Sequence, residues 1–161
     1  MLRLRQLADP RNDSTMMDIP VYFKLEEIVC PHVYNTYGEA AWSFFDPRLI
    51  ETLEKIRERI NRPIMINNWK EGGQYSQRGF RCIKCELVQD AIRDGRLYVS
   101  PHMTGQGVDF DVQGMVAEEV RQWIIKNQNI LPWPVRMEAG VSWVHMDVRG
   151  KDDKKVYLFA A

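Results

Sequence analysis

Two segments in which apolar and polar residues alternate carry the clearest structural signal in the chain. Residues 108–112, Val-Asp-Phe-Asp-Val, place acidic side chains on one face of an expected strand and apolar side chains on the other. Residues 143–148, Trp-Val-His-Met-Asp-Val, alternate in the same way. If the two strands are neighbours in one antiparallel sheet, their apolar faces cover the core and their polar faces line one cleft.

Helical spacing appears in three other places. Asp46 and Pro47 offer an N-cap and a first-turn proline to a helix that ends near Asn61. A second helix follows Gly114, with acidic residues in its first turn and Lys126 in its last, which suits the helix dipole. We expect a third helix over residues 82–93.

Short strands are predicted around these helices, at residues 64–66, 135–138, 142–148 and 155–159, with residues 97–99 as a strand or an extended lead. This mixed order indicates an α+β fold, a mainly antiparallel central sheet flanked by helices. A chain of 161 residues can bury a core without disulfides. We therefore expect one domain over residues 19–161, after a flexible lead-in over residues 1–18.

The candidate chemistry lies on the two alternating segments. The stretch from Ser100 to Asp109, Ser-Pro-His-Met-Thr-Gly-Gln-Gly-Val-Asp, contains His102, and His145 lies in the second segment. Gly105 and Gly107 fit a tight turn with positive φ that carries His102 over the start of the strand. Two imidazoles and one carboxylate leave a fourth position open, as in a catalytic zinc site. The alternative is a buried histidine hydrogen-bonded to a carboxylate, but the matching polar faces favour the metal.

The two motifs, Ser-x-His-x-x-Gly-x-x-x-Asp and Trp-x-His-x-Asp, resemble those of the zinc D-Ala-D-Ala carboxypeptidase family. This family of peptidoglycan peptidases includes phage endolysins and shares its site with the hedgehog signalling domain. The resemblance covers roughly residues 20–150. It implies a hedgehog-like fold, a Zn²⁺ cofactor held by His102, Asp109 and His145, and hydrolysis of a peptidoglycan stem or cross-bridge peptide, as a carboxypeptidase or an endopeptidase.

The chain departs from the family pattern at two positions. Gly107 stands where members commonly have alanine, which is also small. Ser142 stands where many members carry the catalytic carboxylate, three residues before the last histidine. Glu138 is our candidate for this general base, because a hairpin after residue 138 would lay its side chain beside His145.

The remaining candidate residues surround this site. Peptidoglycan stems carry carboxylates, so we expect a carboxylate-binding arginine, with Arg81 the first choice and Arg78 the second. Ser100 and Trp143 are further candidates for substrate contact. We expect Asp111 and Asp147 to orient the ligand imidazoles, and the alternative for both is a solvent-exposed strand acid. The competing function is a catalytically silent cell-wall or peptide-binding module on the same scaffold.

The cysteines allow several interpretations. Cys30, His32, Cys82 and Cys85 could form a Cys₃His structural zinc site. We favour three reduced, partly buried thiols, as in a cytosolic protein. A disulfide is an alternative if the protein works outside the cell, and a cysteine nucleophile paired with His32 is another.

Composition bears on partners and location. The formal net charge is zero and there is no polybasic run, which argues against nucleic acid or an anionic membrane surface as the main partner. No apolar stretch approaches membrane-spanning length, and the first residues lack the apolar core of a signal peptide. We therefore expect a monomer made in the cytoplasm that reaches the cell wall by export or lysis, as a phage or prophage product would.

Overall fold

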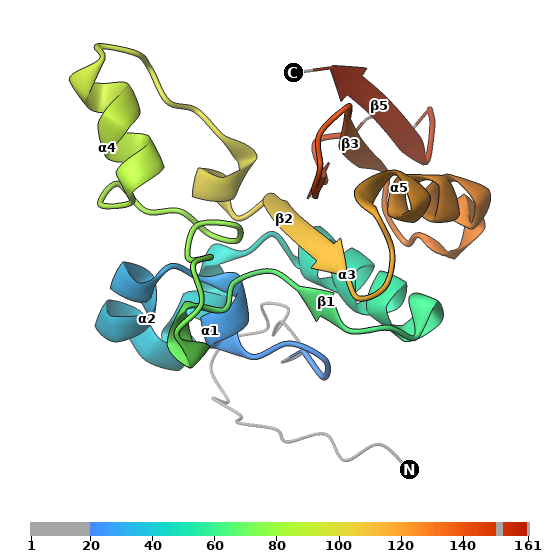
Figure 1. Ribbon diagram of the computed structural model, residues 1–161, viewed down its shortest axis with the longest axis horizontal. Helices are drawn as coiled ribbons and strands as arrows, with labels where there is room; N and C mark the ends of the chain where they lie inside the picture. Colours follow the sequence, from blue (N-terminus) through green and yellow to red (C-terminus); the bar gives the residue numbers. More distant parts are fainter. Residues whose placement is uncertain (1–19, 151–152, 161) are drawn as a thin grey trace, which may run out of the picture.

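The computed structural model describes residues 20–150 and 153–160 (Figure 1). The predicted lead-in over residues 1–18 lies outside these residues. Within them, one mixed sheet has the strand order β1-β2-β4-β3-β5. The β1-β2, β2-β4 and β4-β3 pairs are antiparallel and the β3-β5 pair is parallel. The strands are β1 (Ile64–Met65), β2 (Gly107–Val112), β3 (Val135–Ala139), β4 (Val144–Asp147) and β5 (Val156–Ala160).

Helices surround this sheet, which confirms the α+β class. The α-helices are α1 (Leu25–Ile28), α2 (Pro31–Tyr37), α3 (Pro47–Ile60), α4 (Glu86–Arg93) and α5 (Ala117–Lys126). Four 3₁₀ turns connect them within the described residues: η1 (Gly38–Phe44), η2 (Trp69–Glu71), η3 (Pro101–Thr104) and η4 (Gln128–Ile130). Every helix in the described part of the chain is too short or too polar to cross a lipid bilayer.

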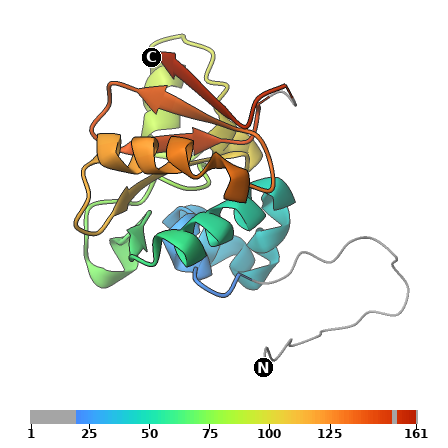
Figure 2. The ribbon, with the colours of Figure 1, turned by 90° about the vertical axis from the view of Figure 1, so that its right-hand side faces the viewer.

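The core lies against the apolar face of β2 and β4, as the alternating pattern predicts. Val108, Phe110, Val144 and Met146 are completely buried there. Helix α5 packs on these two strands, and Figure 2 shows it lying along the sheet with α3 and the N-terminal helices below. Because this face is covered, the polar face of the same strands is left for the site.

Helix α3 forms as its sequence predicts. The Asp46 side chain accepts a hydrogen bond from the backbone N–H of Arg48, and Pro47 occupies the first turn. The helix ends where Asn61 adopts a left-handed conformation with φ of 50°. Helix α5 likewise has Glu118 and Glu119 in its first turn and Lys126 in its last.

Some predicted elements differ from the structure. The helix expected over residues 82–93 begins only at Glu86, because Cys82 to Cys85 form a turn closed by a hydrogen bond from Cys85 N–H to the Cys82 carbonyl oxygen (3.0 Å). Residues 97–99 form neither a helix nor a paired strand. Helices α1 and α2 and the parallel pairing of β5 were not predicted. These features depend on contacts between residues far apart in the chain. Segments this short show no hydrophobic periodicity from which such contacts could be predicted.

The two glycines at the start of β2, Gly105 and Gly107, have different roles. Gly105 has a φ of 66° and ends the η3 turn in the left-handed region, as predicted. The positive φ expected at Gly107 is wrong, because Gly107 is the first residue of β2. A Cβ atom at Gly107 would lie 2.8 Å from the Cβ atom of Pro101, so close packing requires a glycine there.

Candidate metal centre

Strands β2 and β4 bring a carboxylate and an imidazole together. In the antiparallel register, Asp109 is the direct partner of His145. Side chains directly opposite each other on neighbouring strands point to the same face of the sheet. The prediction that the two alternating segments are neighbouring antiparallel strands is therefore confirmed.

The η3 turn supplies the second imidazole. The Ser100 hydroxyl oxygen accepts a hydrogen bond from the backbone N–H of His102 (3.3 Å), which caps the turn. The backbone N–H of Arg81 donates to the His102 carbonyl oxygen (3.1 Å). Ser100, predicted to contact substrate, thus holds the His102 backbone in place.

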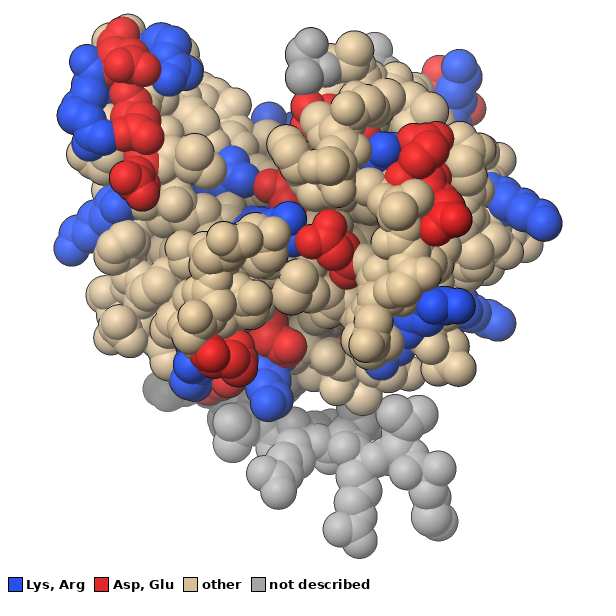
Figure 3. Space-filling view, viewed as in Figure 1, with Lys and Arg blue, Asp and Glu red and all other residues tan. Residues whose placement is uncertain are grey.

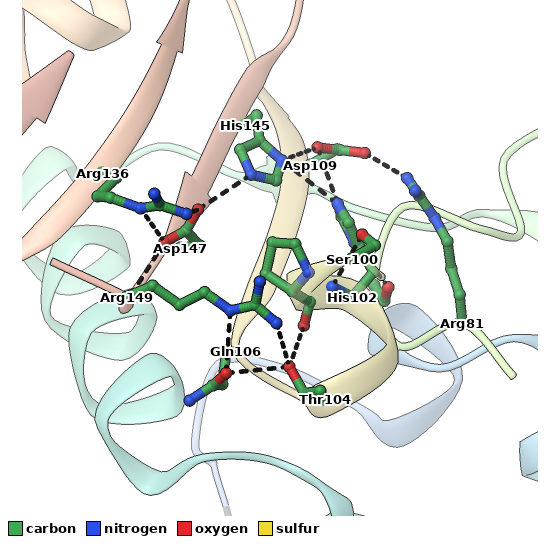
Figure 4. A network of polar contacts seen from close by, with 12 residues as sticks. Arg81, Ser100, His102, Thr104, Gln106, Asp109, Arg136, His145, Asp147 and Arg149 are labelled. Carbon is green, nitrogen blue, oxygen red and sulfur yellow. Dashed lines mark hydrogen bonds and ion pairs between the residues drawn. The ribbon is translucent and has the colours of Figure 1, made fainter. Parts of the chain in front are cut away.

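The ligand atoms of three side chains converge on one point (Figure 4). His102 Nε2 lies 3.3 Å from both His145 Nδ1 and Asp109 Oδ1, and His145 Nδ1 lies 2.7 Å from Asp109 Oδ1. A tetrahedral zinc ion with bonds of about 2.0–2.1 Å keeps its ligand atoms about 3.3 Å apart. Two distances already match this value, and the third requires a small opening of a hydrogen bond. These residues therefore fit a metal ion.

Each candidate ligand is fixed by a second contact on its far side. His102 Nδ1 donates to the Gly79 carbonyl oxygen (2.9 Å), so Nε2 faces the centre. The other oxygen of Asp109 pairs with Arg81 (2.7 Å). His145 Nε2 lies 3.4 Å from Asp147 Oδ2. Contacts of this kind set the tautomer and orientation of metal-binding side chains.

The two acids expected to orient the imidazoles behave differently. Asp147 is completely buried, faces His145 and receives a two-pronged pair from Arg136 (2.8 and 2.9 Å). Asp111 pairs instead with Arg78 (2.5 Å), and among the described residues it has no hydrogen bond to either imidazole. The two acidic side chains on the polar face of β2 thus have different partners: Asp109 belongs to the centre, and Asp111 pairs with Arg78 in the neighbouring loop.

Burial and hydrogen bonding together shift the pKa values of the two imidazoles in opposite directions. Burial lowers the pKa of His102, and its contact with Asp109 offsets this only in part. Burial also opposes a charge on His145, but hydrogen bonds with Asp109 and Asp147 outweigh burial and raise the pKa of His145 to about 9. Burial opposes a charge on Asp109 too, but its hydrogen bonds with the imidazoles keep the pKa of Asp109 well below its usual range.

Protein stripped of metal is therefore expected to carry a charged His145 ring and a neutral His102 ring at neutral pH. The stability that the charged His145 contributes is present below pH 6.5 and is lost as the pH rises through about 9. A metal ion needs the neutral ring, so its apparent affinity should rise by about tenfold per pH unit from neutrality towards that pKa. Imidazole ¹⁵N shifts before and after addition of zinc measure this exchange, and a neutral His145 ring in stripped protein would contradict it.

Glu138 lies on the strand next to His145. The β3-β4 register pairs Met137 with Met146, so one further step along each strand places Glu138 opposite His145. Met137 is completely buried, and by strand alternation Glu138 faces the centre. Within the described residues its carboxylate has no hydrogen bond or ion pair, so it is available to a ligand.

Phe159 is a site residue that the sequence analysis did not identify. It is the parallel partner of Glu138 on β5, and its ring meets the His145 ring edge to face at 6.0 Å. The Arg136 guanidinium lies 5.2 Å from the centroid of the same ring. Phe159 therefore packs beside a candidate ligand, and the parallel position of β5 brings it there.

A cavity of about 650 Å³ leads to the centre. Figure 3 shows the surface hollowed between the part that carries α4 and the part that carries β3 and β5. Arg78, Arg81, Asp109 and Trp143 all line this cavity, so three of the four predicted substrate residues and one candidate ligand meet there, whereas Ser100 is not part of the lining. Both arginines are already paired with carboxylates, Arg81 with Asp109 and Arg78 with Asp111.

Arg121 is a second residue that the sequence analysis passed over. It is 3 % exposed, and its guanidinium donates to the carbonyl oxygens of Val141 and Trp143 (both 3.0 Å), which holds the loop before His145. Its position beside Val120 on the apolar face of α5 is an unusual place for an arginine, and this was the available signal.

Replacing Arg121 with alanine is expected to lower the free energy of unfolding by about 2–4 kcal/mol, because two part-buried carbonyl groups lose a charged donor. Urea unfolding measures the change. Arg59→Ala, at an exposed position of α3, is the control and should change stability by less than about 0.5 kcal/mol. Equal effects of the two substitutions would contradict the role assigned to Arg121.

Comparison of the chain with models of protein families, with curated proteins and with solved structures gave no match. The geometry of the centre and the sequence motifs therefore carry the functional argument.

Proposed function

We propose that this protein is a zinc-dependent peptidase that hydrolyses a peptide bond in peptidoglycan stem or cross-bridge peptides. The observation that carries the proposal is the convergence of His102 Nε2, Asp109 Oδ1 and His145 Nδ1 at spacings suited to tetrahedral zinc. Three protein ligands leave one coordination position for water or substrate, which is typical of catalytic zinc sites.

A zinc ion bound there supplies a Lewis acid and lowers the pKa of a coordinated water to about 7. The other roles in the proposed reaction belong to side chains of the protein. Glu138, opposite His145, accepts the proton of the attacking water and passes it to the leaving amine. Phe159 packs against the His145 ring, and Asp147 keeps that ring oriented.

The cavity suits a peptide that bears a carboxylate. Arg78 is the better partner for this group, because its ion pair is with the partly exposed Asp111 and not with a candidate ligand, and its guanidinium stacks 3.7 Å from the centroid of the Tyr75 ring. Arg81 is committed to Asp109 and Tyr98, so its first task is to orient a ligand of the centre. The order of preference between the two arginines is thus reversed in this proposal.

The proposal extends to fold and setting. The motifs at residues 100–109 and 143–147 resemble those of the zinc D-Ala-D-Ala carboxypeptidases, and the antiparallel pairing of the strands that carry them agrees with a hedgehog-like site. An enzyme of this kind acts on cell wall, which the protein would reach by export or by lysis of the host, as a phage product does.

The second candidate is a peptide-binding module without catalysis. The observation that favours it is Ser142, which is exposed and occupies the position where many relatives in the resembled family have an acid. Such a module would keep the metal centre for structure and use the cavity for binding alone.

Digestion of purified sacculi separates the two candidates. Zinc-loaded protein is expected to release fragments whose masses identify the bond that is cut, and stripped protein should release none. Bound zinc at the centre without any released fragment, across sacculi of different cross-bridge types, would support the binding module and overturn the peptidase.

A further inference from the structure

A second group of metal-binding side chains lies outside the cavity and takes no part in the proposed reaction. Cys30, His32, Cys82 and Cys85 place one ligand atom each within 4.8 Å of one another. Cys30 and His32 lie at the start of α2, and the other two cysteines lie in the turn before α4. Segments separated by about fifty residues therefore meet at this point.

The spacing of these atoms matches a tetrahedral zinc site. Cys82 Sγ lies 3.7 Å from His32 Nδ1 and 4.0 Å from Cys85 Sγ. Zinc bonds of about 2.3 Å to sulfur and 2.0–2.1 Å to nitrogen keep tetrahedral ligand atoms about 3.6–3.8 Å apart. A disulfide between Cys82 and Cys85 would require the two sulfur atoms to approach to about 2.05 Å and would leave Cys30 and His32 without a role.

The turn itself supplies a backbone donor to one of the cysteines. The backbone N–H of Lys84 donates to Cys82 Sγ (3.4 Å). Such a donor favours negatively charged sulfur. The turn from Cys82 to Cys85 gives the two-residue gap typical of structural zinc sites, and this is why helix α4 starts later than its sequence suggested.

The two segments are also joined by backbone contacts. Phe80 N–H donates to the Ile28 carbonyl oxygen (2.8 Å), and Cys30 N–H donates to the Phe80 carbonyl oxygen (3.2 Å). Gly79 lies so close that a Cβ atom would be 1.8 Å from the Ile28 carbonyl oxygen. The positions of the four side chains thus follow from a rigid local framework.

We propose that Cys30, His32, Cys82 and Cys85 bind a structural zinc ion that fastens the start of α2 to the turn before α4. Four protein ligands close the coordination sphere, so this ion does no chemistry on a substrate. The convergence of all four side chains replaces our preference for three unligated thiols.

This zinc ion would support the catalytic centre at a distance. The segment that it fastens carries Gly79, whose carbonyl oxygen receives the His102 ring hydrogen, and Arg81, which pairs with Asp109. Because zinc binding is coupled to folding, loss of this ion should loosen these two supports. The metal-binding claim stands without the proposed peptidase activity, since the ligand sets share no residue.

The test uses the whole protein, purified with zinc under reducing conditions and also loaded with Co²⁺. We expect two zinc ions per chain, and a sulfur-to-cobalt charge-transfer absorption that only thiolate ligands produce. His102→Ala should reduce the zinc content from two to one and keep that absorption. Cys82→Ser/Cys85→Ser should also reduce the content to one and should abolish the absorption. A protein in which the first centre fails would still show the sulfur-bound cobalt.

Two single variants test the proposal in case the double variant does not fold. His32→Ala changes an exposed ligand and should shift the cobalt spectrum and speed zinc loss to a chelator, whereas Lys84→Ala, between the two cysteines, should change neither. Absence of sulfur-to-cobalt absorption in the wild-type protein would overturn the proposal. Rapid reaction of all three thiols with a thiol reagent in folded, zinc-loaded protein would overturn it too.

Discussion

Replacing His102 with alanine is expected to empty the candidate metal centre and to reduce the proposed hydrolysis of muropeptides by about three orders of magnitude or more. The expected loss is large because a bound metal supplies several kcal/mol of transition-state stabilisation. Metal analysis and the rate of fragment release from sacculi measure the two effects together. The folded state is checked by circular dichroism, because His102 is 2 % exposed and its removal leaves a hole beside Gly79.

Asp109→Asn is the companion variant, since it keeps the volume of the side chain and removes its charge. It should weaken zinc binding and also release Arg81 from its ion pair. If either variant kept full activity after removal of adventitious metal, the assignment of the three ligands would be wrong.

The second large effect is expected from Glu138→Gln, which should lower kcat by roughly 10²–10⁴-fold and leave the zinc content unchanged. Glutamine has nearly the same shape, but it cannot accept the proton of the attacking water. Glu138 follows Met137, which is paired with Met146, and among the described residues it has no hydrogen bond to a candidate ligand, so the metal should be retained. Steady-state kinetics with a purified muropeptide, together with metal analysis, measures both quantities.

Ser142→Ala is the matched control for this experiment. Ser142 is exposed in the loop before β4, at the position where many members of the resembled family have an acid. We expect its substitution to leave kcat unchanged. Retained turnover in Glu138→Gln would show that Glu138 is not the general base. A large loss of kcat in Ser142→Ala would instead indicate a role for the loop before β4.

The sequence by itself determined several of the local elements that hold the site. Alternation at residues 108–112 and 143–148 sets which side chains face the core, because side chains on a strand point to opposite faces in turn. Local chemistry also determined α3, whose N-cap at Asp46 and first-turn proline depend only on neighbouring residues. For the same reason the positive φ at Gly105 was predictable.

Tertiary structure alone decided the rest. The parallel pairing of β5 with β3 brings Phe159 to His145, and no local pattern encodes a pairing between distant strands. The contacts that hold each ligand from behind, Gly79 with His102 and Arg81 with Asp109, join loops and strands far apart in the chain. The meeting of Cys30 and His32 with Cys82 and Cys85 is of the same kind, because residue spacing shows which side chains can bind a metal, whereas only the folded backbone brings them within reach of one ion.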